Sequence, residues 1–153
     1  MEANLPPPPS GTLQGSLHLF PLRVYYEDTD LSGVVYHANY LRWFERGRSD
    51  LLRLLNVDQR AAAEQGEGTY AVADLSIRYL APARLDDAIT IATMAVEIGA
   101  ASVRMNQRAL RGDVLLAEAT VRVGFISPDG RPRRQPAAWR RAFEPLLPAK
   151  DLV

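Results

Sequence analysis

Three acids and a histidine lie close together between residues 24 and 40. Glu27, Asp28 and Asp30 follow residues of strand character, and His37 follows a polar turn that contains glycine. A carboxylate in such a turn can face a ligand, where it could attack a carbonyl carbon or take a proton from water. Asp is also frequent in turns for structural reasons, because its side chain bonds nearby backbone groups. The residues alone therefore leave both roles open for Asp30, and Glu27 and Asp28 are interpreted as solvated charges.

The histidine is followed at once by a predicted helix, from about residue 38 to residue 55. Its apolar positions recur at three- and four-residue steps, which is the helical period: Tyr40, Trp43, Phe44, Gly47, Leu51, Leu54 and Leu55. The first amides of a helix have no partner within it and lie at its positive end. The amides of Tyr36, His37 and Ala38 could therefore polarise a carbonyl group. The His37 side chain could donate a hydrogen bond or carry a proton, and a purely structural cap is the alternative.

The helix carries two unusual residues in its apolar stripe. Gly47 lies near the middle of the stripe, which predicts close approach of another backbone and a helix pressed against a sheet. Arg48 also lies within the stripe, and Glu45 lies three residues earlier at its edge, a spacing that allows an ion pair. This pair could support a site, or it could be a structural salt link. Four charged residues are expected to face water on the opposite side: Arg42, Arg46, Asp50 and Arg53.

Five stretches have strand character, at residues 17–26, 70–79, 88–98, 102–110 and 114–126. Most of the later connections are short, and short connections make antiparallel neighbours. One long apolar helix against one antiparallel sheet is an α+β, two-layer design. Short helices are also expected at residues 58–64 and 137–147.

Composition excludes several kinds of site. The 153 residues fit one domain, and the formal net charge of zero disfavours a nucleic-acid partner. The absence of cysteine excludes disulfides and a cysteine nucleophile, and two histidines make a metal site unexpected. We predict a Pro-rich flexible tail at residues 1–16, a single domain at 17–147 and a second tail at 148–153. No apolar run is long enough to span a bilayer, and the chain does not begin with a signal-peptide pattern, so a cytoplasmic location is expected.

Four segments together resemble a known family. They are Val24–Asp30, Gly33–Tyr40, Phe44–Arg48 and Tyr79–Asp87. The chain resembles the hotdog-fold acyl-CoA thioesterases of the 4-hydroxybenzoyl-CoA thioesterase family, and most of all the branch associated with the Tol–Pal cell-envelope system. Ser32 stands where this branch often has glycine, and Gly47 where alanine is common.

The resemblance implies a fold, an activity and a set of site residues. It implies a five-stranded antiparallel sheet wrapped around one long central helix, with dimers or tetramers whose active sites lie between subunits. It implies hydrolysis of acyl-CoA to a free acid and CoA, without a metal or other cofactor. Asp30 corresponds to the catalytic acid and His37 to a second functional position. Some hotdog thioesterases place this acid on the helix, which makes Glu45 the rival to Asp30.

Several assignments stay open at this stage. Four arginines are candidates to meet the CoA phosphates: Arg84, Arg131, Arg133 and Arg134. Acyl carrier protein is a further candidate partner. A non-catalytic protein that binds acyl-CoA or acyl carrier protein, and a hotdog hydratase acting on enoyl thioesters, are the alternative functions. The acyl group cannot be read from the sequence.

Overall fold

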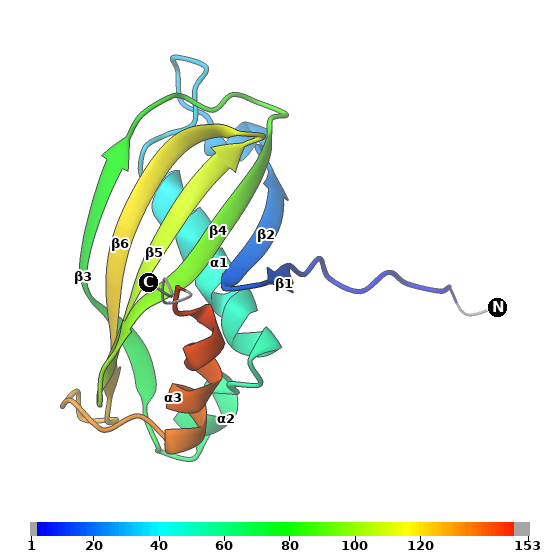
Figure 1. The fold of residues 1–153 in the computed structure, drawn as a ribbon. Coiled ribbons are helices and arrows are strands. Elements are labelled where there is room, and N and C mark those ends of the chain that lie inside the picture. The colour runs from blue at the N-terminus through cyan, green and yellow to red at the C-terminus, as the bar shows by residue number, and fades with distance from the viewer. Residues whose placement is uncertain (1–2, 149–153) are drawn as a thin grey trace.

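The computed structural model describes residues 3–148 and contains one antiparallel sheet of six strands (Figure 1). The order of the strands across the sheet is β1-β2-β4-β5-β6-β3, so β1 and β3 form its edges. The strands are β1 (Thr12–Gln14), β2 (Leu17–Arg23), β3 (Thr69–Tyr79), β4 (Ala88–Ile98), β5 (Ser102–Arg111) and β6 (Val114–Ile126).

The sheet curves around one long helix, α1 (Asn39–Leu54), as Figure 1 shows. The shorter helices are α2 (Gln59–Glu64) and α3 (Ala137–Phe143), with single 3₁₀ turns at η1 (Tyr26–Asp28) and η2 (Glu144–Leu146). None of the helices described between residues 3 and 148 is long and apolar enough to cross a membrane.

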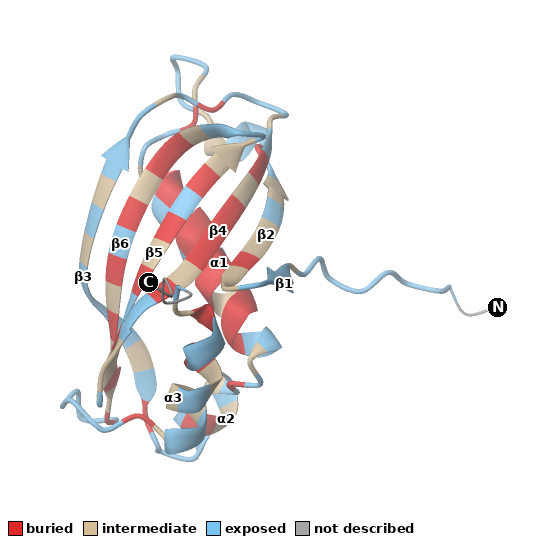
Figure 2. Cartoon of the chain, in the orientation of Figure 1, coloured by how far each residue is buried: buried red, intermediate tan, exposed pale blue. Residues whose placement is uncertain are grey.

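The predicted apolar stripe of α1 forms the centre of the core. Trp43, Phe44 and Leu51 are almost completely buried. Figure 2 shows that buried residues are also frequent in the inner strands β4, β5 and β6, which curve around α1. A Cβ atom built on Gly47 would lie 2.9 Å from Ile91 Cγ2 of β4. That distance is too short for two carbon atoms, so glycine allows α1 to lie directly on the sheet. The predicted close approach is confirmed, although the neighbour is a side chain and not a backbone.

The fold differs from the expected hotdog arrangement in number of elements. The sheet has six strands and not five. Two further α-helices accompany the central one, and they lie within the ranges 58–64 and 137–147 where short helices were predicted. The sixth strand, β1, lies within residues 1–16, which were expected to form a flexible tail. It pairs with β2, with Thr12 opposite Leu19. Residues 1–2, and all of the expected C-terminal tail except Pro148, lie outside the described residues.

Asp50 is buried, although the helical pattern predicted that it faces water. Its Oδ2 lies 2.7 Å from His18 Nε2 of β2 and accepts a hydrogen bond from the Gly11 amide at 2.8 Å. Its Oδ1 accepts a hydrogen bond from Ser10 Oγ at 2.8 Å. The prediction was wrong because the N-terminal segment covers this face of α1.

Candidate active site

Asp30 lies in a tight turn whose two arms are bonded to each other. Thr29 and Val35 form an antiparallel bridge, and the Asp30 amide donates to the Val34 carbonyl at 3.0 Å. The Gly33 amide donates back to the Asp30 carbonyl at 3.0 Å. Gly33 has φ of 83°, a left-handed conformation that glycine adopts without strain. These hydrogen bonds therefore fix the backbone conformation at Asp30 and the direction in which its side chain leaves the turn.

The Asp30 carboxylate is exposed but not free in orientation. Its Oδ1 accepts hydrogen bonds from the Ser32 hydroxyl and, at 2.8 Å, from the Ser32 amide. These bonds, first from the hydroxyl and then from the amide, stabilise the charged form and lower the pKa of Asp30 below its ordinary 3.8. Asp30 is therefore ionised at neutral pH, and its second oxygen, Oδ2, can contact a ligand.

The turn is fastened to the start of α1 through Asp28. The Asp28 carbonyl accepts from the Tyr36 amide at 2.9 Å and from Asn39 Nδ2 at 3.0 Å. Its carboxylate accepts from the Tyr25 amide at 2.8 Å. Asp28 is thus half-buried and structural, which corrects its interpretation as a solvated charge. Tyr36 must also be removed from the predicted carbonyl-polarising amides, because its N–H already has a partner.

The other two predicted amides remain candidates. Ala38 is the N-cap of α1, and within residues 3–148 neither its amide nor that of His37 has a hydrogen-bond acceptor. The His37 ring is exposed, with its centroid 4.6 Å from that of Tyr36 and 6.1 Å from that of Tyr79. The Tyr79 hydroxyl donates to the His37 carbonyl at 2.8 Å. This bond ties the start of α1 to the end of β3.

A hollow of about 330 Å³ lies beside His37. Its wall is mostly apolar and comes from the start of α1 and the end of β3, with Tyr40, Tyr79 and Leu80 among its residues. A carbonyl group near the two amides could therefore be attached to an apolar chain that lies in this hollow.

Glu45 and Arg48 are not brought to this end of the protomer. They line a different cavity further along α1, and they form no ion pair within 4.0 Å in the described part of the chain. Arg48 is buried and instead donates to Gln107 Oε1 at 2.8 Å, whereas Glu45 is exposed. The predicted pairing across one helical turn is therefore wrong.

The four candidate arginines divide into two groups. Arg84 is exposed and forms a bridge with Val34, next to the Asp30 turn. The other three follow the end of β6, where Ile126 is opposite Thr69 at the start of β3. Tyr79 and His37 lie at the other end of β3, so one protomer does not bring Arg131, Arg133 or Arg134 to Asp30. Arg133 Nη1 donates to the Glu67 carbonyl at 2.6 Å.

Two residues of the site were missed at the sequence level, Ser32 and Tyr79. A serine two residues after an aspartate is a turn signal that could have identified Ser32 as a hydrogen-bond donor. Tyr79 is 42 residues from His37, and no local pattern connects them. In the described part of the chain, no group of three or more His, Cys, Asp or Glu side chains could hold a metal ion.

The site lies within a region that matches a known family. A sequence model of the thioesterase-like superfamily matches residues 24–145. The chain belongs to this superfamily. The acyl-CoA thioesterase YbgC of Haemophilus influenzae is 42% identical over 125 residues, which are 78% of this chain and 92% of that relative. The acyl-CoA thioester hydrolase YbgC of Escherichia coli is 39% identical over 131 residues, 84% of this chain and 97% of the relative.

Solved structures of thioesterases have the same fold. A probable thioesterase from Bartonella henselae is 40% identical with a TM-score of 0.76, covering 78% of this chain and 99% of that one. A 1,4-dihydroxy-2-naphthoyl-CoA thioesterase from Synechocystis has a TM-score of 0.77 at 22% identity, covering 83% and 95% of the two chains. At this low identity, the similarity to the Synechocystis enzyme shows a shared fold and nothing more. Together these findings confirm the hotdog thioesterase family predicted from the sequence.

Proposed function

We propose that this thioesterase-superfamily member hydrolyses the thioester of an acyl-CoA, with Asp30 as the reacting carboxylate. The observation that carries the proposal is the state of Asp30: exposed, ionised at neutral pH and held in a turn that is bonded to the start of α1. An ionised carboxylate can act as a general base or as a nucleophile, whereas a protonated one can do neither. The names of the relatives agree with this reaction.

The reaction can follow either of two balanced routes. As a base, Asp30 takes a proton from water while the water oxygen bonds to the acyl carbon. As a nucleophile, Asp30 bonds to that carbon directly, and water then hydrolyses the resulting anhydride. In both routes the C–S bond breaks, coenzyme A leaves as a thiolate and takes up a proton, and the acid is released.

The start of α1 would stabilise the developing negative charge on the carbonyl oxygen. The amides of His37 and Ala38 are the proposed donors, and one such donor is commonly worth about 3 kcal/mol. The His37 ring would add a hydrogen bond to the oxygen or deliver a proton to the leaving thiolate.

We further propose that two copies pair through β3. This strand is an edge of the sheet, and Val72, Tyr79 and the following Leu80 are about half exposed. Around Asp30, Leu31 and Tyr26 are also highly exposed, so the protomer leaves apolar surface uncovered beside the site. Pairing through β3 would cover this end of the protomer, and such dimers could associate further into tetramers. Light scattering during gel filtration would measure the mass of the protein in solution and therefore the number of its subunits.

Pairing about a two-fold axis would also make the two β3 strands antiparallel. The Asp30 end of one subunit would then approach the opposite end of its partner's β3. This arrangement would allow Arg84 of one subunit and Arg131, Arg133 or Arg134 of the partner subunit to meet the phosphates of one CoA.

The cellular setting is proposed on the resemblance alone. We propose a cytoplasmic enzyme of the Tol–Pal-associated branch that needs no cofactor other than the CoA of its substrate. Acyl carrier protein is a proposed alternative carrier of the acyl group. Comparing turnover of one acyl group on CoA and on acyl carrier protein would decide between the carriers.

The experiment that tests the function is a substrate panel. Purified protein is incubated with short, long and aromatic acyl-CoAs and with an enoyl-CoA, and free thiol is measured with a colorimetric reagent. Thiol release above the uncatalysed rate is expected with at least one acyl-CoA. Binding without turnover would indicate a carrier or sensor, and loss of the conjugated double bond without thiol would indicate a hydratase; either result would overturn the proposal.

A further inference from the structure

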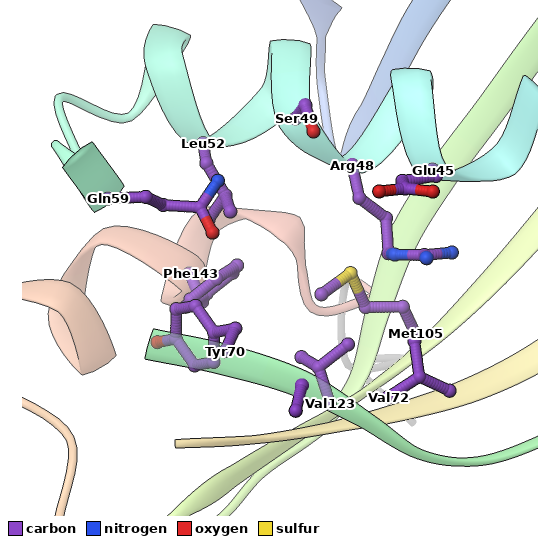
Figure 3. Close-up of a pocket in the computed structure, with 11 residues that line it drawn as sticks. Glu45, Arg48, Ser49, Leu52, Gln59, Tyr70, Val72, Met105, Val123 and Phe143 are labelled. Carbon is purple, nitrogen blue, oxygen red and sulfur yellow. The ribbon is translucent and has the colours of Figure 1, made fainter. Parts of the chain in front are cut away.

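A second cavity, of about 210 Å³, lies between α1, β3 and α3, away from the Asp30 turn (Figure 3). About half of its wall is apolar, and this part includes Leu52, Tyr70, Val72, Met105, Val123 and Phe143. The rest of the wall is polar and comes from Glu45, Arg48 and Ser49 of α1 and from Gln59 of α2. An apolar cavity of ~150 Å³ can hold a benzene ring, so this one has room for a phenyl ring or a chain of about six carbons.

Arg48 supplies the only positive charge on the described wall of this cavity, and it is held in a fixed position. Its side chain extends from α1 toward Met105 in Figure 3. The residue is only 8% exposed, and its Nη1 donates to Gln107 Oε1 at 2.8 Å. The Gln107 amide nitrogen donates to the Phe44 carbonyl at 2.9 Å and to Thr93 Oγ1 at 3.0 Å. Those two bonds fix the orientation of the Gln107 amide, so Oε1 faces Arg48.

Arg48 has no ion-pair partner among the described residues, although the charge of Glu45, three residues earlier, favours its charged form and offsets part of the effect of burial. Between residues 3 and 148 no carboxylate oxygen lies within 4.0 Å of the Arg48 guanidinium, and Nε and Nη2 have no acceptor there. Burial lowers the pKa of Arg48, which reflects the unfavourable removal of a cation from water. Buried charges in proteins are normally paired, so a buried, oriented guanidinium beside a cavity is suited to an anion.

We propose that this cavity binds a small carboxylate, whose oxygens pair with Arg48 and whose apolar body lies against Tyr70, Met105 and Phe143. We expect the ligand to carry a single negative charge, because the exposed carboxylate of Glu45 at the edge of the cavity would repel a second one. The carboxylate could come from a free organic acid or from the far end of an acyl group that carries a terminal carboxyl. The first source is independent of the proposed function, whereas the second rests on it.

The binding test compares carboxylates with amides of the same shape in the unmodified protein. Hexanoate and benzoate are titrated against hexanamide and benzamide, and binding is followed by calorimetry and by NMR shifts of Met105. We expect the carboxylates to bind at least tenfold more tightly. Equal affinity for acid and amide would overturn the proposal, and this comparison does not depend on any variant folding.

Variants locate the effect at Arg48. Arg48→Gln is expected to weaken benzoate binding at least tenfold and Glu45→Gln to strengthen it several-fold, whereas Arg46→Gln, an exposed neighbour on α1, should leave it unchanged. Circular dichroism checks that each variant is folded. Unchanged benzoate affinity in a folded Arg48→Gln protein would also overturn the proposal.

A kinetic comparison separates the two sources of carboxylate. If the acyl group supplies it, Arg48→Gln lowers kcat/KM for adipoyl-CoA and not for hexanoyl-CoA, which has the same length. If a free acid supplies it, the ratio of the two constants stays the same in the variant while benzoate binding is lost. Failure of the proposed thioesterase activity would appear as no turnover of either substrate, and the binding result would still decide the proposal.

Discussion

Asp30 and Asp50 are both carboxylates with lowered pKa values, but their surroundings are opposite. Asp30 is exposed, and its hydrogen bonds come from Ser32, two residues away. Asp50 is buried, and its partners Ser10, Gly11 and His18 lie 40, 39 and 32 residues away. Burial by itself would raise the pKa of Asp50, and the bonds from these partners reverse that effect.

The comparison separates a carboxylate that can react from one that cannot. Both oxygens of Asp50 already accept bonds from the chain, so this residue fastens the N-terminal segment to α1. Asp30 Oδ2 accepts no hydrogen bond from the described residues, while the bonds from Ser32 to Oδ1 keep the group ionised. A low pKa therefore does not identify a reacting acid; exposure and an unoccupied oxygen are needed as well.

The largest expected effect on stability comes from the buried carboxylate. Asp50→Asn should lower the free energy of unfolding by about 3 kcal/mol. The amide removes the buried negative charge beside His18, and its single acceptor oxygen cannot serve all of the donors Ser10, Gly11 and His18. Chemical denaturation at pH 7 measures the change. The matched control is Asp74→Asn, which removes an exposed ion pair with Arg122 and should cost less than about 1 kcal/mol.

The same variant has a predictable dependence on pH. The folded-state pKa of Asp50 is below the unfolded value, so its contribution is present above the unfolded pKa of ~3.9 and is lost as pH falls through the folded value. The stability difference between the original protein and Asp50→Asn should therefore be constant near neutrality and shrink below about pH 4. A difference that grows on acidification would contradict the assignment.

At the other end of α1, His37→Ala should reduce kcat on the order of 10²-fold with little change in stability, because its ring is exposed and would act only in the reaction. Thiol release from the best acyl-CoA of the panel measures the effect. His37→Gln, which keeps a donor but not a titratable group, should recover part of the rate if the ring donates a hydrogen bond. An activity of His37→Ala equal to that of the original protein would remove this residue from the site.

The smallest effect is expected at Ser32. Ser32→Ala removes the hydroxyl that most strongly lowers the pKa of Asp30, so this pKa rises and the acidic limb of kcat/KM moves to higher pH. The rate at pH 7 should change only a few-fold, because Asp30 stays ionised there. A profile that does not move, or moves to lower pH, would show that the limb does not report Asp30.

The contrast between the two carboxylates also shows what the sequence could predict. The Asp30 turn, the start of α1 and the apolar stripe with Gly47 depend on neighbours within a few residues, and the sequence predicted all three. The burial of Asp50, the Arg48–Gln107 bond and the Tyr79–His37 bond join residues that only the folded sheet brings together. A helical period places a residue on a face of the helix but does not say which distant segment covers that face. Ser10 and Gly11, just before β1, covered a face of α1 that was expected to meet water.

The central claim is that Asp30 is the reacting carboxylate, and Asp30→Asn tests it most directly. The amide keeps the shape of the side chain and can still accept a bond from Ser32, but it neither takes a proton from water nor attacks a carbonyl carbon effectively. Thiol release by the folded variant is measured with the best acyl-CoA of the panel. We predict that kcat/KM falls by about 10³-fold or more with unchanged thermal stability. A folded Asp30→Asn protein within tenfold of the original rate would contradict the account and direct attention to Glu45.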